Sequence, residues 1–144
     1  MAGRVIAGRP IVPGEAEGAA LVTDAPLSFW GGYDFATGTI IDKHHPLEGV
    51  RAAGKVLAVP FSKGSSTTTA VLLEAVRAGT APSAILTTGA DSFFALAAIV
   101  AEKMYGRSFA VVALEPRDFE TLVTGVHLRV DRNGRIYENH ARAD

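Results

Sequence analysis

The sequence contains no cysteine among its 144 residues. This absence excludes disulfide bonds, and it excludes thiolate ligation of an iron–sulfur cluster by this chain. An excess of charge of one sign is also missing, because the formal net charge is −1, so electrostatics gives no case for nucleic acid or an anionic membrane as the partner. No apolar run approaches the length of a membrane span, and no secretory segment precedes the first glycine-rich turns. We therefore expect a cytoplasmic protein.

Hydrophobic residues make up 48% of the chain and charged residues 20%, and this length fits one compact domain over residues 1–144. Both ends favour strands. Residues 4–12 predict a strand interrupted by glycine and proline, and residues 18–23 predict the strand that returns after a Pro-Gly turn. Near the C-terminus, Asn133-Gly134 between alternating runs predicts a β-hairpin.

The middle of the chain predicts two α/β units. Buried strands are expected over residues 56–59, 84–87 and 109–114, with a helix after each of the first two. The second helix, capped by Asp91-Ser92, is apolar around most of its circumference over residues 93–104, which predicts burial on more than one side. The fold class is therefore mixed, β-rich α/β: barrel-like sheets covered by two main helices. A doubly wound fold is less favoured because the first fifty or so residues show no helical period.

The segment from strand 56–59 into the first helix carries five consecutive hydroxyl residues, Ser65 to Thr69. Serine and threonine cap helix N-termini, but five exceed what one cap requires. A helix N-terminus offers free N–H donors and the positive end of the helix dipole, and Lys63 adds a cation. Plain capping and binding of an anion or carboxylate both fit, and we favour the second. The pattern matches neither a Walker loop nor a nucleophile elbow.

A long loop before this segment contains paired glycines, Asp42 and the adjacent His44 and His45. These residue types could form a metal or acid–base site, but their spacing matches no known zinc motif, so turns and backbone capping are favoured and no metal ligands are predicted. Asp91 is interpreted as a helix cap. Trp30 is either a core anchor or an interface residue.

Together, residues 31–38, 42–49, 63–67 and 97–106 resemble the small, swivelling-domain subunit of the aconitase X family, over roughly residues 4–115. The resemblance implies a swivelling β/β/α domain and a hydro-lyase. It also implies a large partner subunit that supplies an iron or iron–sulfur centre, with none bound by this chain. Ser65 would be the base that removes the substrate proton, and Ser66 and Thr67 would orient a substrate carboxylate beside Lys63 and Gly64. A serine anion at this position is stabilised by helix-terminal N–H groups and a nearby cation.

The chain departs from the family pattern at Thr68-Thr69, at Phe35 and at Asp91-Ser92. The family contains dehydratases of cis-3-hydroxy-L-proline and of mevalonate 5-phosphate. The alanine-rich composition and the absence of a multi-arginine phosphate cluster favour the hydroxyproline class, with mevalonate 5-phosphate as the alternative. From another class, a non-catalytic anion-binding or regulatory module remains open. A carrier phosphorylated on His44 or His45 suits the fold but has no support in the residues.

Overall fold

The computed structural model describes residues 3–63, 67–89 and 91–139. In chain order, its elements are β1 (Val5–Ala7), β2 (Arg9–Val12), β3 (Ala16–Val22), β4 (Tyr33–Asp34), β5 (Thr39–Ile40), β6 (Val56–Ala58), α1 (Thr67–Ala78), β7 (Ala84–Thr87), α2 (Ser92–Tyr105), β8 (Ala110–Ala113), α3 (Pro116–Phe119), β9 (His127–Val130) and β10 (Arg135–Asn139). The strand–helix units of the middle and the C-terminal hairpin are confirmed. No helix in these ranges is long and apolar enough to cross a bilayer.

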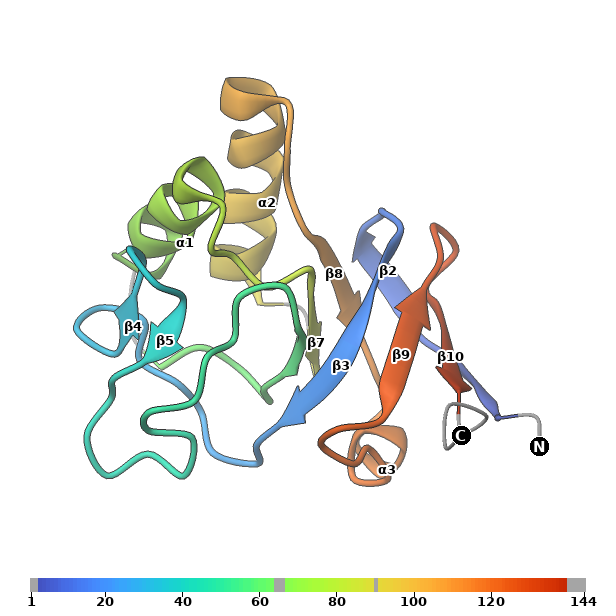
Figure 1. Cartoon of the computed structure of the whole chain (residues 1–144). Coiled ribbons are helices and arrows are strands. Elements are labelled where there is room, and N and C mark those ends of the chain that lie inside the picture. The colour runs from blue at the N-terminus through green and yellow to red at the C-terminus, as the bar shows by residue number, and fades with distance from the viewer. Residues whose placement is uncertain (1–2, 64–66, 90, 140–144) are drawn as a thin grey trace.

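Eight strands form one sheet in the order β1-β10-β9-β3-β6-β7-β8-β2. Its two edge strands, β1 and β2, are separated in sequence by Gly8 alone, so the chain itself bends from one edge to the other and nearly closes a barrel (Figure 1). At the bend the Gly8 amide donates to the Gly134 carbonyl over 2.9 Å. A Cβ atom on Gly8 would lie 2.4 Å from Cγ1 of Val112. The barrel therefore closes at Gly8, where there is no room for a side chain. The predicted fold class is confirmed.

The pairing of β3 differs from the sequence-based expectation. Strand β3 lies antiparallel to β9 and parallel to β6. Strand β2 instead pairs antiparallel with β8, at one edge of the sheet. The prediction that residues 18–23 return beside residues 4–12 is therefore wrong. The sequence Pro13-Gly14 is a local hairpin signal. Closure of the sheet nevertheless pairs β2 with β8, and β3 with β6 and β9. The predicted interruption of residues 4–12 is confirmed, with the bend at Gly8 and a shift in register after Pro10.

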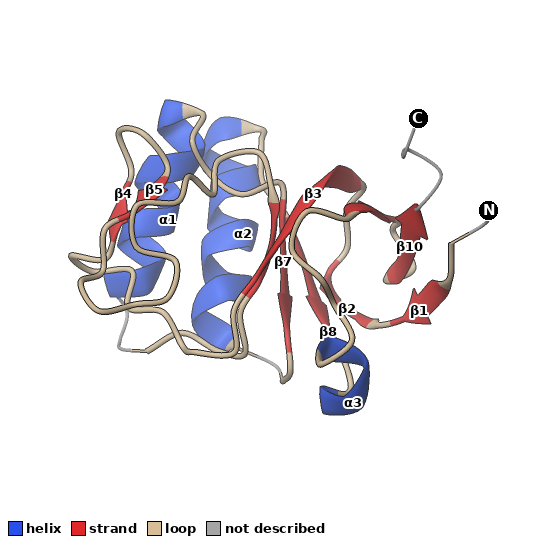
Figure 2. Cartoon of the chain, turned by 60° about the horizontal axis from the view of Figure 1, so that its bottom comes forward, coloured by secondary structure: helices blue, strands red, loops and turns tan. Residues whose placement is uncertain are grey.

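The sheet separates two hydrophobic cores. One lies between the sheet and the helices α1 and α2, which cover the same face of the parallel strands (Figure 2). The other fills the barrel interior and is completed by Phe119 of α3 and by Leu122. Because successive residues of a strand point to opposite faces, β7 supplies Ile85 to the first core and Ala84 and Leu86 to the second.

Helix α2 buries one face only. Its buried residues are Phe94, Ala97, Ala98 and Ala101, whereas the side chains of Leu96, Ile99 and Met104 are 49%, 48% and 60% exposed. The prediction of burial on more than one side is therefore wrong. Among the described elements, α1 and the strands β2 and β8 pack against this helix, and together they bury its small, alanine-rich face.

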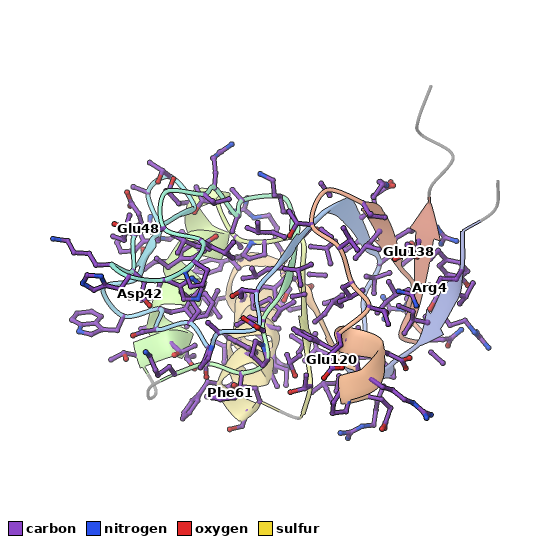
Figure 3. All side chains as sticks on the ribbon, turned by 90° about the horizontal axis from the view of Figure 1, so that it is seen from below. Arg4, Asp42, Glu48, Phe61, Glu120 and Glu138 are labelled. Atoms are coloured by element: carbon purple, nitrogen blue, oxygen red, sulfur yellow. The ribbon has the colours of Figure 1, made fainter. Side chains whose placement is uncertain are left out.

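The two ends of the described chain lie together. Strand β1 pairs antiparallel with β10, and the Glu138 amide donates to the Arg4 carbonyl over 2.9 Å. The Arg4 guanidinium also contacts the buried Glu138 carboxylate over 2.9 Å. Both residues lie at one end of the molecule in Figure 3, far from Phe61 and Asp42.

Candidate functional site

The hydroxyl-rich segment lies where the buried strand β6 passes into α1. After Val59, Pro60 lacks an amide donor and ends the strand, although its carbonyl still accepts from Thr88. The Lys63 amide then donates to the Leu27 carbonyl over 2.9 Å. Lys63 is exposed, and Thr67 begins α1, as expected from the sequence. The predicted site residues Gly64, Ser65 and Ser66 lie outside the described residues.

Asp91 joins this segment to the next strand–helix unit. Its Oδ1 accepts hydrogen bonds from the amides of Phe93 and Phe94, over 3.0 and 3.2 Å, and so caps α2 as predicted. Its Oδ2 accepts from both the amide and the hydroxyl of Ser62, each over 2.8 Å. The second pair of bonds was not expected from the sequence. The loops after β6 and β7 are therefore joined at the carboxyl edge of the sheet, where α/β sheets usually bind ligands.

The first turn of α1 carries buried hydroxyl groups. Thr69 donates to the Phe93 carbonyl over 3.2 Å, which ties α1 to α2. The Thr68 hydroxyl is buried and has no hydrogen-bond partner among the described residues. An unpaired buried hydroxyl costs free energy and is uncommon.

The described part of the site is shallow. A hollow of about 150 Å³ is lined by Pro60, Phe61, Thr88, Gly89 and Asp91. Ligand pockets usually enclose roughly 300–1,000 Å³, so this hollow is smaller than an ordinary ligand pocket. Phe61 is 52% exposed beside this hollow, and a second surface could cover it.

The glycine-rich part of the long loop has a structural role. Tyr33 donates its hydroxyl to the Thr80 carbonyl over 2.8 Å and packs against Phe29. Burial raises the pKa of the Tyr33 hydroxyl well above its ordinary value, although the nearby Arg51 charge opposes this shift. Thr80 follows the C-terminus of the 12-residue helix α1, about 18 Å from its start. This motif therefore lies away from the hydroxyl segment.

The histidine pair also fits turns and capping. His45 is buried, and its Nδ1 accepts from the Leu47 amide over 3.0 Å. In the described ranges no group of three or more His, Asp or Glu side chains is placed to hold a metal ion. Trp30 is 70% exposed. Of the two interpretations of this residue, the core anchor is therefore excluded.

Sequence reasoning found Asp91 as a cap but missed Ser62 as its partner. The two residues are 29 positions apart, and no local pattern connects them. Their proximity could be inferred only from the order of the strands. Ser62 follows β6 and Asp91 follows β7, and the carboxyl ends of these neighbouring parallel strands share one edge of the sheet.

A nearly closed mixed sheet, with two helices over its parallel strands and hydroxyl groups at the first strand–helix junction, is the architecture of a swivelling β/β/α domain. The family model described as "Aconitase X swivel domain" matches residues 5–138. The chain belongs to this family.

Three similar proteins place the chain within the family. It is 45% identical to a cis-3-hydroxy-L-proline dehydratase of Pseudomonas aeruginosa over 78% of this chain and 20% of that protein. It is 36% identical to the phosphomevalonate dehydratase small subunit of Pyrococcus furiosus, covering 95% and 96%. The solved structure of Thermococcus kodakaraensis aconitase X (holo-form) superposes with a TM-score of 0.84 at 34% identity, covering 94% of this chain and 98% of that one. The chain thus spans about a fifth of the first relative and nearly all of the second.

Proposed function

We propose that this chain is the small subunit of a heteromeric hydro-lyase of the aconitase X type, inactive without a large subunit. The main support for this proposal is the hydroxyl segment at the β6–α1 junction. It lies on a domain whose relatives are named as dehydratases or dehydratase subunits. The small volume of the described hollow supports the need for a second chain, since a reacting substrate must be enclosed to exclude water.

In this proposal Ser65 removes a proton from the carbon next to the one that bears the hydroxyl group. The electron pair of the broken C–H bond forms the double bond while the C–O bond breaks. The departing hydroxide and the proton taken up by Ser65 together account for the one water that is lost. The first-turn amides of α1 and the Lys63 charge favour the serine anion, because both stabilise negative charge at a helix N-terminus. Thr67, with Gly64 and Ser66, would hold the substrate carboxylate.

The leaving hydroxyl group needs an acid. The chain has no cysteine, and its described His, Asp and Glu residues form no metal cluster. An iron or iron–sulfur centre therefore does not fit this chain, and the proposal assigns it to the large subunit.

For the substrate we favour cis-3-hydroxy-L-proline, because the identity to the Pseudomonas aeruginosa dehydratase is 45% against 36% for the Pyrococcus furiosus small subunit. Mevalonate 5-phosphate is the alternative, supported by the match to the whole length of that subunit.

The test is to co-purify the chain with its large subunit and to assay water elimination from both compounds. We expect activity in the complex and none in the isolated chain. Ser65→Ala should lower kcat by about 10²- to 10⁴-fold, the usual contribution of a positioned base, with assembly unchanged.

Ser83→Ala is the matched control, because Ser83 directly precedes β7 at the opposite end from the site and binds the Lys55 carbonyl. It should leave turnover unchanged. Wild-type turnover in Ser65→Ala would refute the role of this serine. Ligand binding without dehydration in the assembled complex would favour the non-catalytic anion-binding module instead.

A further inference from the structure

The Asp91 carboxylate does more than a helix cap requires. Capping uses one oxygen, which accepts from the first amides of the helix. Here Oδ1 performs that role toward α2, while Oδ2 accepts two further bonds from Ser62. A carboxylate offers about four acceptor sites, so its hydrogen-bonding capacity is filled, half of it by a residue of another loop.

These bonds hold the chain on both sides of residues 64–66. On the N-terminal side, Ser62 is bound by Asp91, and Lys63 is bound by the Leu27 carbonyl. On the C-terminal side, Thr69 is bound by the carbonyl of Phe93, whose own amide is capped by Asp91. The N-terminus of α2 is thus bonded to the chain on both sides of residues 64–66, to Ser62 through the Asp91 carboxylate and to Thr69 through the Phe93 carbonyl.

We propose that Asp91 is a positioning residue for the hydroxyl segment. It acts through Ser62, three residues before Ser65, and fixes where that segment begins relative to α1 and α2. This inference rests on the proposed function for its catalytic consequence. Holding reacting groups in place can be worth a large factor, since a displacement of about 1 Å can cost about 100-fold in rate.

The substitution Asp91→Asn separates the two roles of the carboxylate. Asparagine caps helices about as well as aspartate, so its carbonyl oxygen can keep the amides of Phe93 and Phe94. Its NH₂ group cannot accept from Ser62. In the complex of both subunits, we expect kcat to fall about 10- to 100-fold. KM should rise as well, because the displaced segment also carries Gly64, Ser66 and Thr67, which are proposed to hold the substrate carboxylate.

Ser62→Ala sharpens the assignment. It removes the hydroxyl bond and keeps the amide bond to Oδ2, so its loss in kcat should be smaller than that of Asp91→Asn. In the double variant the losses should not multiply, because both substitutions break the same contact.

Asp131→Asn is the control for a purely structural effect. Asp131 has the same arrangement in the C-terminal hairpin: Oδ1 accepts from the amides of Asn133 and Arg135, over 2.9 and 3.0 Å, and Oδ2 accepts from the Tyr137 hydroxyl over 2.9 Å. This variant loses the same kind of bond at the other side of the molecule and should keep its kcat. Wild-type kcat in Asp91→Asn would overturn the proposal, as would equal losses of kcat in Asp91→Asn and Asp131→Asn.

Amide hydrogen exchange provides a readout that does not depend on activity. Asp91→Asn should increase the exchange rate of the Ser62 and Lys63 amides, because their local opening becomes easier, and leave that of Phe94 little changed. Unchanged exchange at Ser62 would overturn the positioning role. If the wild-type complex has no dehydratase activity, the proposed function fails, and faster exchange at Ser62 would still support the positioning role.

Discussion

The two cores of the molecule are built from opposite faces of the same strands. The side chains that the parallel strands supply to the two cores differ in size. Beneath the helices lie Phe29, Tyr33 and Phe94, with Leu57 and Ile85 from the sheet. Inside the barrel, three of the four parallel strands, β6, β7 and β8, contribute Val56, Ala58, Ala84, Leu86, Ala110 and Val112. Half of this inward set is alanine. A sheet that closes on itself leaves little interior volume, so small side chains suit the inward positions of these strands.

This contrast bears on the site, which lies at the margin of the helix-covered core. The Phe94 amide is capped by Asp91, while the Phe94 ring is fully buried and packs edge-on against Phe29 at 5.6 Å. Packing of large side chains thus holds the end of α2 that carries Asp91. The barrel interior has no such link to the described part of the site.

The largest effect should come from emptying the helix-covered core. Phe94→Ala removes a fully buried ring and should lower the free energy of unfolding by about 3–5 kcal/mol, measured by urea denaturation of the purified chain. Phe35→Ala, at a residue 43% exposed, is the matched control and should stay within about 0.5 kcal/mol. Similar losses in the two variants would contradict the assigned role of Phe94.

A smaller effect should come from overfilling the barrel. Ala84 is fully buried between its strand partners Val56 and Ala110, so Ala84→Leu should cost about 1–3 kcal/mol by overpacking. Ala70→Leu, on the exposed side of α1, should change stability by less than about 0.5 kcal/mol. Unchanged stability in Ala84→Leu would mean that the interior has spare volume and that the contrast between the cores is false.

The smallest effect concerns Asp131 in the hairpin, away from both cores. Burial alone would raise its pKa, but hydrogen bonds from the Tyr137 hydroxyl and the amides of Arg135 and Asn133, with the Arg135 charge, hold the pKa below its usual range. Since the folded-state pKa is the lower one, this stabilisation is present above the unfolded-state pKa and is lost as the pH falls through the folded-state pKa. Denaturation midpoints followed from neutral into acid pH should show this loss, and Asp131→Asn should remove its share. An identical pH profile in the variant would contradict the assignment.

Much of the fold could be predicted because local signals agree with the final structure. Pro60 follows the end of β6, Gly79 follows the end of α1, and Asn133-Gly134 forms the hairpin turn. Local patterns could not give the neighbours of β3, because pairing depends on closure of the barrel. The exposure of Leu96, Ile99 and Met104 was missed for a related reason: an apolar helix surface does not reveal how many elements pack against it. The short helix α3 carries too few residues to show a period.

The candidate site was predictable in its location but not in its contacts. The hydroxyl run correctly indicated the start of α1, and the family resemblance correctly indicated the class of domain. The roles of Lys63, Ser65 and Thr67 stay predictions. The Ser62–Asp91 contact could not be derived, since it requires knowing that β6 and β7 are neighbours and how far each loop extends beyond its strand.

The pairing of β1 with β10 also determines how this domain can be joined to other polypeptides. Both ends of the described chain leave from one corner of the barrel, away from the β6–α1 junction (Figures 1 and 3). A linker fused at either end, or circular permutation that joins the two ends and opens the chain elsewhere, would therefore leave the hydroxyl segment unobstructed. The region that matches this chain makes up about a fifth of two longer relatives.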